Sequence, residues 1–178
     1  LNEQVIGRRY LTAEVVNGVI YIIGGQVSDG SYVETVQSYN ITNNSITTVA
    51  PLPTKRKQLN SVVYGNKIYV IGGQLENDGA MTNVVEVYNP SVDLWTTLSP
   101  MPTARECDVA LIEDKIYAFG GYNGSTSLTT VEIYDIENDS WTTANDMPYA
   151  LSAYHLASFE NFVFLFGDYS AHIDEVNM

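Results

Sequence analysis

The sequence predicts an all-β protein built from repeated four-stranded antiparallel sheets. A Gly-Gly pair returns every 48 residues, at Gly24-Gly25, Gly72-Gly73 and Gly120-Gly121. Each pair follows a short apolar run that contains a tyrosine, and a weaker fourth copy ends in Gly167-Asp168. No helical 3.6-residue period of apolar side chains occurs. A repeat of this length is one supersecondary unit that recurs along the chain.

Each repeat contains four strand signals, which are clearest in residues 54–102. An extended run precedes the turn pair Gly65-Asn66, which is typical of a tight hairpin. The following run is nearly all β-branched or aromatic, so it predicts a strand buried on both faces. Gly-Gly ends it because glycine takes the backbone angles that a tight exit requires. The expected strands are 58–64, 67–71, 83–88 and 94–98, with a polar loop at 74–82 and an Asn-Pro turn at 89–93.

The third and fourth strands carry aromatic residues at a fixed offset. Tyr88 precedes Trp95 by seven residues, and Tyr134 precedes Trp141 by the same distance. In the first unit Tyr39 is followed at this distance by Ile46 instead. The Gly-Gly to tyrosine distance varies, which confines length variation to the loop between the second and third strands. Packing such sheets face to face around an axis buries both faces, which is the β-propeller arrangement.

These residues resemble the Kelch repeat, in which an apolar strand, Gly-Gly, a loop, a Val-Glu-x-Tyr strand and a Trp strand follow one another. The third strands Val85-Glu86-Val87-Tyr88 and Val131-Glu132-Ile133-Tyr134 carry the resemblance, which covers nearly the whole chain. It implies a propeller, often of six blades, that mainly binds other proteins. Some relatives are enzymes or bind sugars. We expect a single array over residues 1–178, with blades at about 7–53, 54–102, 103–148 and a partial one at 149–178.

The ends of the sequence predict an incomplete ring. Leu1 aligns with the tail of a fourth strand, and Met178 falls inside a third strand. We therefore expect about 3.5 blades, which belong to a longer propeller or form a half-propeller that pairs with another copy as a homo-oligomer. Unpaired sheet edges would otherwise favour aggregation.

Composition narrows the range of partners. The formal net charge is −13, from 21 acidic and 8 basic residues. An acidic surface argues against binding nucleic acid or an anionic membrane, because both carry negative charge. No run of 18 apolar residues is present, so no membrane span is expected. The single Cys107 is interpreted as a small core residue.

The few basic residues predict a ligand site. Six of them lie in connections between a fourth strand and the next first strand: Arg8, Arg9, Lys55, Arg56, Lys57 and Arg105. Arg9, Lys57 and Arg105 each stand 15 residues before a Gly-Gly pair, which predicts an arc of cations at one mouth of the channel. Arginine can hold a carboxylate through two parallel hydrogen bonds. The alternative is that these side chains support loops or form ion pairs.

We therefore predict a non-catalytic protein-interaction module that binds an acidic peptide or protein segment at this basic mouth. The predicted ligand-binding residues are Arg8, Arg9, Arg56, Lys57, Arg105, Tyr32 and Tyr122. Two alternatives are a carbohydrate-binding or carbohydrate-active propeller, similar to a sialic-acid epimerase or a lectin, and a self-assembling half-propeller. No nucleophile, P-loop or metal-binding motif occurs, so no catalytic residue, cofactor or metal is expected. His155 aligns with Asn60 and Thr12 and is expected to face the channel as a structural residue.

Overall fold

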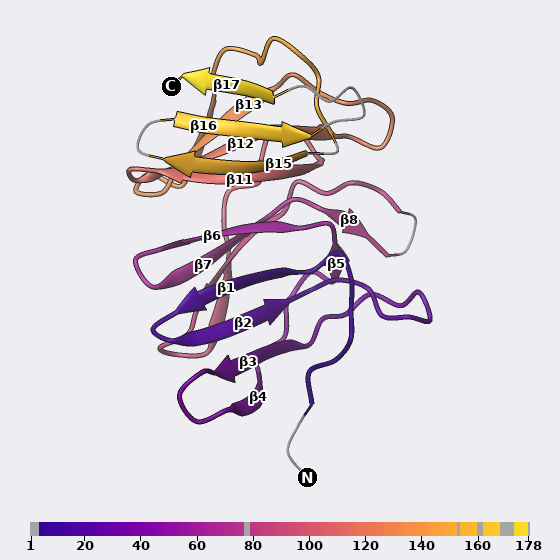
Figure 1. Ribbon diagram of the computed structural model, residues 1–178, viewed down its shortest axis with the longest axis vertical. Coiled ribbons are helices and arrows are strands. Elements are labelled where there is room, and N and C mark those ends of the chain that lie inside the picture. The colour runs from indigo at the N-terminus through magenta and orange to yellow at the C-terminus, as the bar shows by residue number, and fades with distance from the viewer. Residues whose placement is uncertain (1–3, 77–78, 153, 160–161, 168–172, 178) are drawn as a thin grey trace.

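The computed structural model describes residues 4–76, 79–152, 154–159, 162–167 and 173–177, and these ranges contain β-strands and turns but no helix (Figure 1). Within these ranges no helix could therefore cross a membrane. Three four-stranded antiparallel sheets follow one another along the chain, and a three-stranded sheet comes last. The predicted all-β fold of four-stranded units is confirmed. Three residues used in the sequence analysis lie outside the described residues. They are Asp168, which follows Gly167 in the fourth repeat, and the two terminal residues Leu1 and Met178.

The strands lie close to their predicted positions. The first sheet contains β1 (Thr12–Val16), β2 (Val19–Ile23), β3 (Val36–Asn40) and β4 (Ser45–Val49). The second contains β6 (Asn60–Tyr64), β7 (Lys67–Ile71), β9 (Val85–Asn89) and β10 (Leu94–Thr97). The third contains β11 (Glu106–Ile112), β12 (Lys115–Tyr122), β13 (Val131–Asp135) and β14 (Ser140–Thr143). The last contains β15 (Tyr154–Phe159), β16 (Phe162–Gly167) and β17 (Ile173–Asn177).

Successive sheets pack face to face, as Figure 1 shows from β4 at one end to β17 at the other. The first strands β1, β6, β11 and β15 lie next to one another, so they form the inner side of the stack. A separate apolar core fills each junction. Ile23 with Val70 belongs to the first core, Ile71 with Ala118 to the second, and Phe119 with Leu165 to the third. This radial order is the blade arrangement of a propeller.

The seven-residue spacing between tyrosine and tryptophan is explained by the hairpin of the third and fourth strands, which we call the outer hairpin of each sheet. Tyr88 and Trp95 are cross-strand partners with ring centroids 5.0 Å apart. Trp95 Nε1 donates to the carbonyl of Ala50 in the preceding sheet at 3.0 Å, and Asp93 accepts from Tyr88 Oη at 2.6 Å and from the Ala50 amide at 2.8 Å. Each outer hairpin thereby attaches its sheet to the one before it.

The third sheet repeats this attachment. Asp139 accepts from Tyr134 Oη and from the Ser99 amide, and Trp141 Nε1 donates to the Ser99 carbonyl. In the first sheet Tyr39 donates to Asn44 at 2.6 Å, and Ile46 stands opposite Tyr39 in place of a tryptophan. The first sheet thus lacks the indole that the other two use to donate to a neighbouring backbone.

One end of the sheets gathers the connections that carry the basic residues. The short strands β5 (Arg56–Lys57) and β8 (Gln74–Leu75) pair with each other, and bridges join Arg9 to Gln26 and Leu128 to Leu151. Each pairing joins a connection that enters a first strand to a loop between second and third strands. Both kinds of loop therefore lie on one face of the stack, which we call the mouth.

Candidate functional site

Two of the predicted ligand-binding arginines are buried inside the blades. Arg56 is 0% exposed, and its Nη1 atom forms an ion pair with Glu86 Oε2 at 2.5 Å. Its Nε atom donates to the carbonyl of Gly72 at 2.8 Å. Arg105 is also 0% exposed and forms the equivalent ion pair with Glu132. Neither guanidinium group reaches the surface, so neither can contact a ligand in this conformation.

These ion pairs belong to a small network that fixes the connection between blades. Glu86 also accepts a hydrogen bond from Thr54 Oγ1 at 2.8 Å, and Arg56 donates to the Thr54 carbonyl at 2.7 Å. Thr103 and Glu132 make the matching hydroxyl contact in the third sheet at 2.7 Å. The alternative interpretation, in which these arginines support loops through ion pairs, therefore applies to Arg56 and Arg105.

Arg8 occupies the same place in the first sheet, with a different partner. It donates to the carbonyl of Thr35 at 2.7 Å and to Gln37 Oε1 at 2.9 Å. Gln37 stands opposite Ile22 as Glu86 stands opposite Val70, so an amide replaces the carboxylate. Burial lowers the pKa of Arg8. Arg8, Arg56 and Arg105 are therefore structurally equivalent, and the predicted placement of Arg105 in one arc with Arg9 and Lys57 is wrong.

A missing residue in the third repeat explains this error. The carbonyls of Arg9, Lys57 and Glu106 lie against the second glycine of their own pairs, Gly25, Gly73 and Gly121. Tyr10 and Gln58, with φ of 58° and 53°, follow the first two of these residues. The third repeat has no counterpart to them, and β11 shows a register shift between Glu106 and Asp108. Counting back from Gly-Gly therefore aligned Arg105 with the wrong neighbours, and Glu106 takes the place of Arg9 and Lys57.

The cations that remain accessible at the mouth lie over aromatic rings. The Arg9 guanidinium carbon is 5.2 Å from the ring centroid of Tyr10, and Lys57 Nζ is 5.3 Å from the same centroid. Lys57 Nζ is also 5.0 Å from the ring of Tyr32. We call Arg9, Tyr10, Lys57 and Tyr32 the rim cluster. Such contacts hold a cation in place while it remains accessible.

The neighbours of the rim cluster are already paired. Tyr32 donates its hydroxyl to Gln74 Oε1 at 3.1 Å and its amide to Glu76 Oε1 at 2.8 Å. Lys55 forms an ion pair with Glu76 Oε2 at 2.6 Å, which neutralises that cation. Tyr10 is 49% exposed and belongs to the cluster, although it was not among the predicted ligand-binding residues. The only sequence signal for it was its position directly after Arg9. Tyr122 pairs with Glu106 in the third sheet, and within the described residues it forms no hydrogen bond or ring contact with the rim cluster.

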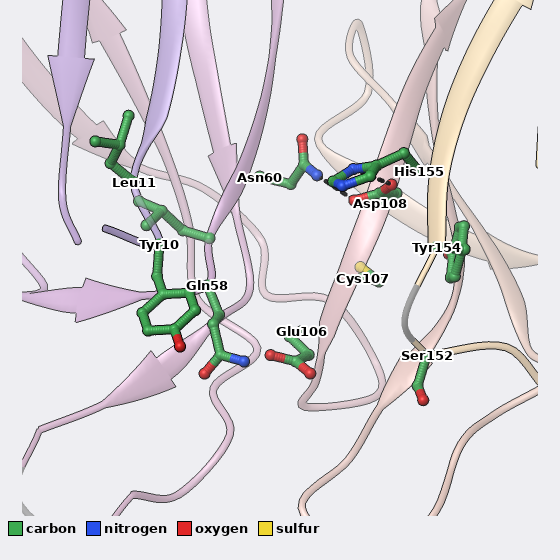
Figure 2. A pocket seen from close by; sticks show the side chains of 11 residues that line it. Tyr10, Leu11, Gln58, Asn60, Glu106, Cys107, Asp108, Ser152, Tyr154 and His155 are labelled. Carbon is green, nitrogen blue, oxygen red and sulfur yellow. Dashed lines mark hydrogen bonds and ion pairs between the residues drawn. The ribbon is translucent and has the colours of Figure 1, made fainter. Parts of the chain in front are cut away.

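An axial hollow of about 650 Å³ opens beside the rim cluster. Asn60, Asp108 and His155 come from equivalent places on β6, β11 and β15 and lie together in it (Figure 2). Asn60 Nδ2 donates to Asp108 Oδ1 at 2.6 Å, and His155 Nδ1 lies 3.8 Å from Asp108 Oδ2. His155 therefore lines the channel side, as its alignment with Asn60 predicted. The hollow is lined by Tyr10, Leu11, Gln58, Leu59, Asn60, Glu106, Cys107, Asp108, Ser152, Tyr154 and His155.

Burial raises the pKa of several side chains on the inner side of the stack. It raises the pKa of Glu14, Glu106 and Asp108, although Ser61, Lys57 and His155 respectively oppose the shift. It also raises the pKa of Cys107 to about 11, so the thiol is protonated at neutral pH and suits the predicted core role. Among the described residues, no three His, Cys, Asp or Glu side chains are arranged to hold a metal ion.

The stacked sheets, the Gly-Gly strand exits and the paired loops at one mouth define a repeat protein of the β-propeller class. The chain belongs to the Kelch-repeat family, because the family model described as the KLHDC2/KLHL20/DRC7 Kelch-repeats domain matches residues 3–177. A comparison with curated proteins found no match. Kelch domains generally bind proteins, and the chain is accordingly a propeller module of the protein-interaction type.

Proposed function

We propose that the mouth binds an acidic segment of a partner protein through the rim cluster, and that this chain performs no catalysis. The observation that carries the proposal is the pair of accessible cations, Arg9 and Lys57, which lie over Tyr10 and Tyr32. Arg9 and Lys57 make no ion pair within the described part of the chain, so both charges are available to a carboxylate. Arginine offers a carboxylate two parallel hydrogen bonds, and aromatic side chains are common anchors in protein interfaces.

The overall charge makes this mouth selective. The chain has only eight basic residues against 21 acidic ones. Arg56 and Arg105 are buried, and Lys55 and Lys115 are paired with Glu76 and Asp135. A small basic site on an acidic surface favours a local acidic segment over a long polyanion, which the remaining surface repels. In this proposal Arg8, Arg56 and Arg105 support the mouth from within, and Tyr122 is a further contact on the third sheet.

The proposal predicts that Arg9→Ala combined with Lys57→Ala weakens binding of an acidic probe by tenfold or more. The probe is a fluorescein-labelled peptide of alternating glutamate and glycine, and fluorescence anisotropy at low and at physiological salt measures its affinity. The loss follows from removal of both cations, and affinity for the unaltered protein should fall as salt rises because the contacts are accessible.

The matched control is Lys67→Ala combined with Lys115→Ala, which makes the same charge change at hairpins remote from the mouth. Lys67 follows the Gly65-Asn66 turn, and Lys115 lies at the corresponding start of β12. This control should bind the probe nearly as well as the unaltered protein. Equal losses in both double variants would mean that net charge alone governs binding and would refute the rim site.

A second candidate function is carbohydrate binding in the axial hollow. The observation that favours it is the polar group of Asn60, Asp108 and His155, because paired amide, carboxylate and imidazole groups can bind sugar hydroxyls. Isothermal titration with a panel of neutral and acidic monosaccharides tests this function. Saturable binding that Asp108→Asn removes and the rim double variant retains would favour the carbohydrate function over the peptide function.

A further inference from the structure

We propose that the mouth recognises a partner segment of mixed charge, with an acidic side chain over the first two sheets and a basic side chain over the third. This inference rests on the proposed function and adds a second specificity element to it. Glu106 is the residue that receives the basic group. The partner is therefore a peptide segment with a lysine or arginine close to its acidic residues, rather than a uniformly acidic one.

The first support is structural equivalence around the mouth. Arg9, Lys57 and Glu106 occupy the same place in three successive sheets, with each carbonyl against the second glycine of its pair. Ser152 follows in the last sheet, directly after Leu151, which takes the position of Arg105. The charge along this row is therefore positive, positive, negative and neutral. A ligand that crosses the row meets a change of sign between the second and third sheets.

The second support is the unsatisfied state of the Glu106 carboxylate. Glu106 is half-buried, and none of the side-chain hydrogen bonds or ion pairs found in the described ranges involves it. The charge of Lys57 acts on Glu106, but Lys57 Nζ lies over the rings of Tyr10 and Tyr32 and forms no ion pair with this carboxylate within the described residues. A partly buried carboxylate without a partner gains from an incoming cation, since the charged group has already lost part of its hydration.

The third support is the space in front of Glu106. Its carboxylate lines the axial hollow, where Figure 2 shows it directed toward the side of the hollow that carries Gln58. Asp108 lies deeper and already accepts from Asn60 Nδ2 and from the backbone amide of Leu156. Glu106 is therefore the carboxylate that an entering lysine or arginine would meet first, next to the accessible cations of the rim cluster.

The test compares two labelled peptides that share an acidic run and differ at one position, which is lysine in one and norleucine in the other. Norleucine keeps the aliphatic chain and removes the ammonium group. The lysine is placed at each of several distances from the acidic run, and anisotropy measures the affinities. The unaltered protein should prefer the best lysine peptide over its norleucine counterpart by about tenfold, which is a usual size for a charge-assisted contact.

Glu106→Gln should remove this preference without weakening binding of the norleucine peptide, because the acidic run of that peptide loses a nearby negative charge and no attractive contact. The matched control is Glu113→Gln, which makes the same chemical change at the exposed β11–β12 hairpin, remote from the mouth, and should keep the preference. If the unaltered protein binds both peptides equally at every spacing, the mixed-charge inference is wrong while the rim site stands. If it binds neither peptide, the proposed function itself fails.

Discussion

Replacing Glu132 with alanine should destabilise the protein by about 3–5 kcal/mol, which is the usual cost of leaving one member of a buried ion pair without its partner. Glu132 is 2% exposed and is paired with the fully buried Arg105. Without it, Arg105 would keep its charge in a low-dielectric environment, and the contact to Thr103 Oγ1 would also be lost. Urea unfolding, followed by the fluorescence of Trp95 and Trp141 and by circular dichroism, measures the change.

Two further variants separate the buried charge from other causes. Asp135→Ala breaks the exposed ion pair with Lys115 in the same sheet, and it should cost far less because water screens that pair. Replacing Arg105 with methionine and Glu132 with leucine together should restore most of the stability, because an apolar pair of similar volume needs no compensating charge. A loss for Glu132→Ala no greater than that for Asp135→Ala would show that Arg105 is not isolated from solvent.

The sequence was sufficient to predict the blades because their signals are local and repeated. Strand β7 was predicted at residues 67–71, where it is found, since β-branched residues and a Gly-Gly exit act over a few positions. The Tyr88–Trp95 contact was visible as a fixed spacing because cross-strand partners joined by a tight turn keep a constant separation.

The candidate site was predicted less well, because side-chain direction depends on single-residue register. The third repeat is one residue shorter before its Gly-Gly pair, so Glu106 stands where a cation was expected. Counting 15 residues back from Gly-Gly selected Arg105 instead. Burial of Arg56 depends on Glu86, thirty residues away, which no local pattern connects to it. The Val-Glu-x-Tyr strand did contain the relevant signal. Its glutamate faces the interior as the partner of an arginine, and its replacement by Gln37 in the first sheet accompanies the weaker burial of Arg8.

Gly73→Ala should destabilise the protein by about 2–6 kcal/mol, with a simultaneous loss at the mouth. Gly73 has φ of +108°, which an L-residue adopts at a cost of about 1–3 kcal/mol. An added Cβ would lie 2.6 Å from the Lys57 carbonyl oxygen and 3.2 Å from the Leu59 backbone. Backbone atoms cannot rotate away, so the connection must move, at a further cost of about 1–3 kcal/mol. Because that connection carries Lys57, affinity for the acidic peptide should fall as well.

Gly65→Ala is the matched control for this prediction, because Gly65 lies in the same sheet with φ of +57° and no atom within 4 Å of an added Cβ. It should cost only about 1–2 kcal/mol from the left-handed backbone and should leave peptide binding unchanged. Urea midpoints and anisotropy on the two variants separate backbone strain from close approach. Equal destabilisation by both changes would show that the second glycine of the pair is needed only for its backbone angle. A larger effect at Gly73 would show that the second glycine is also needed because the connection that enters the first strand passes directly over it at Lys57 and Leu59.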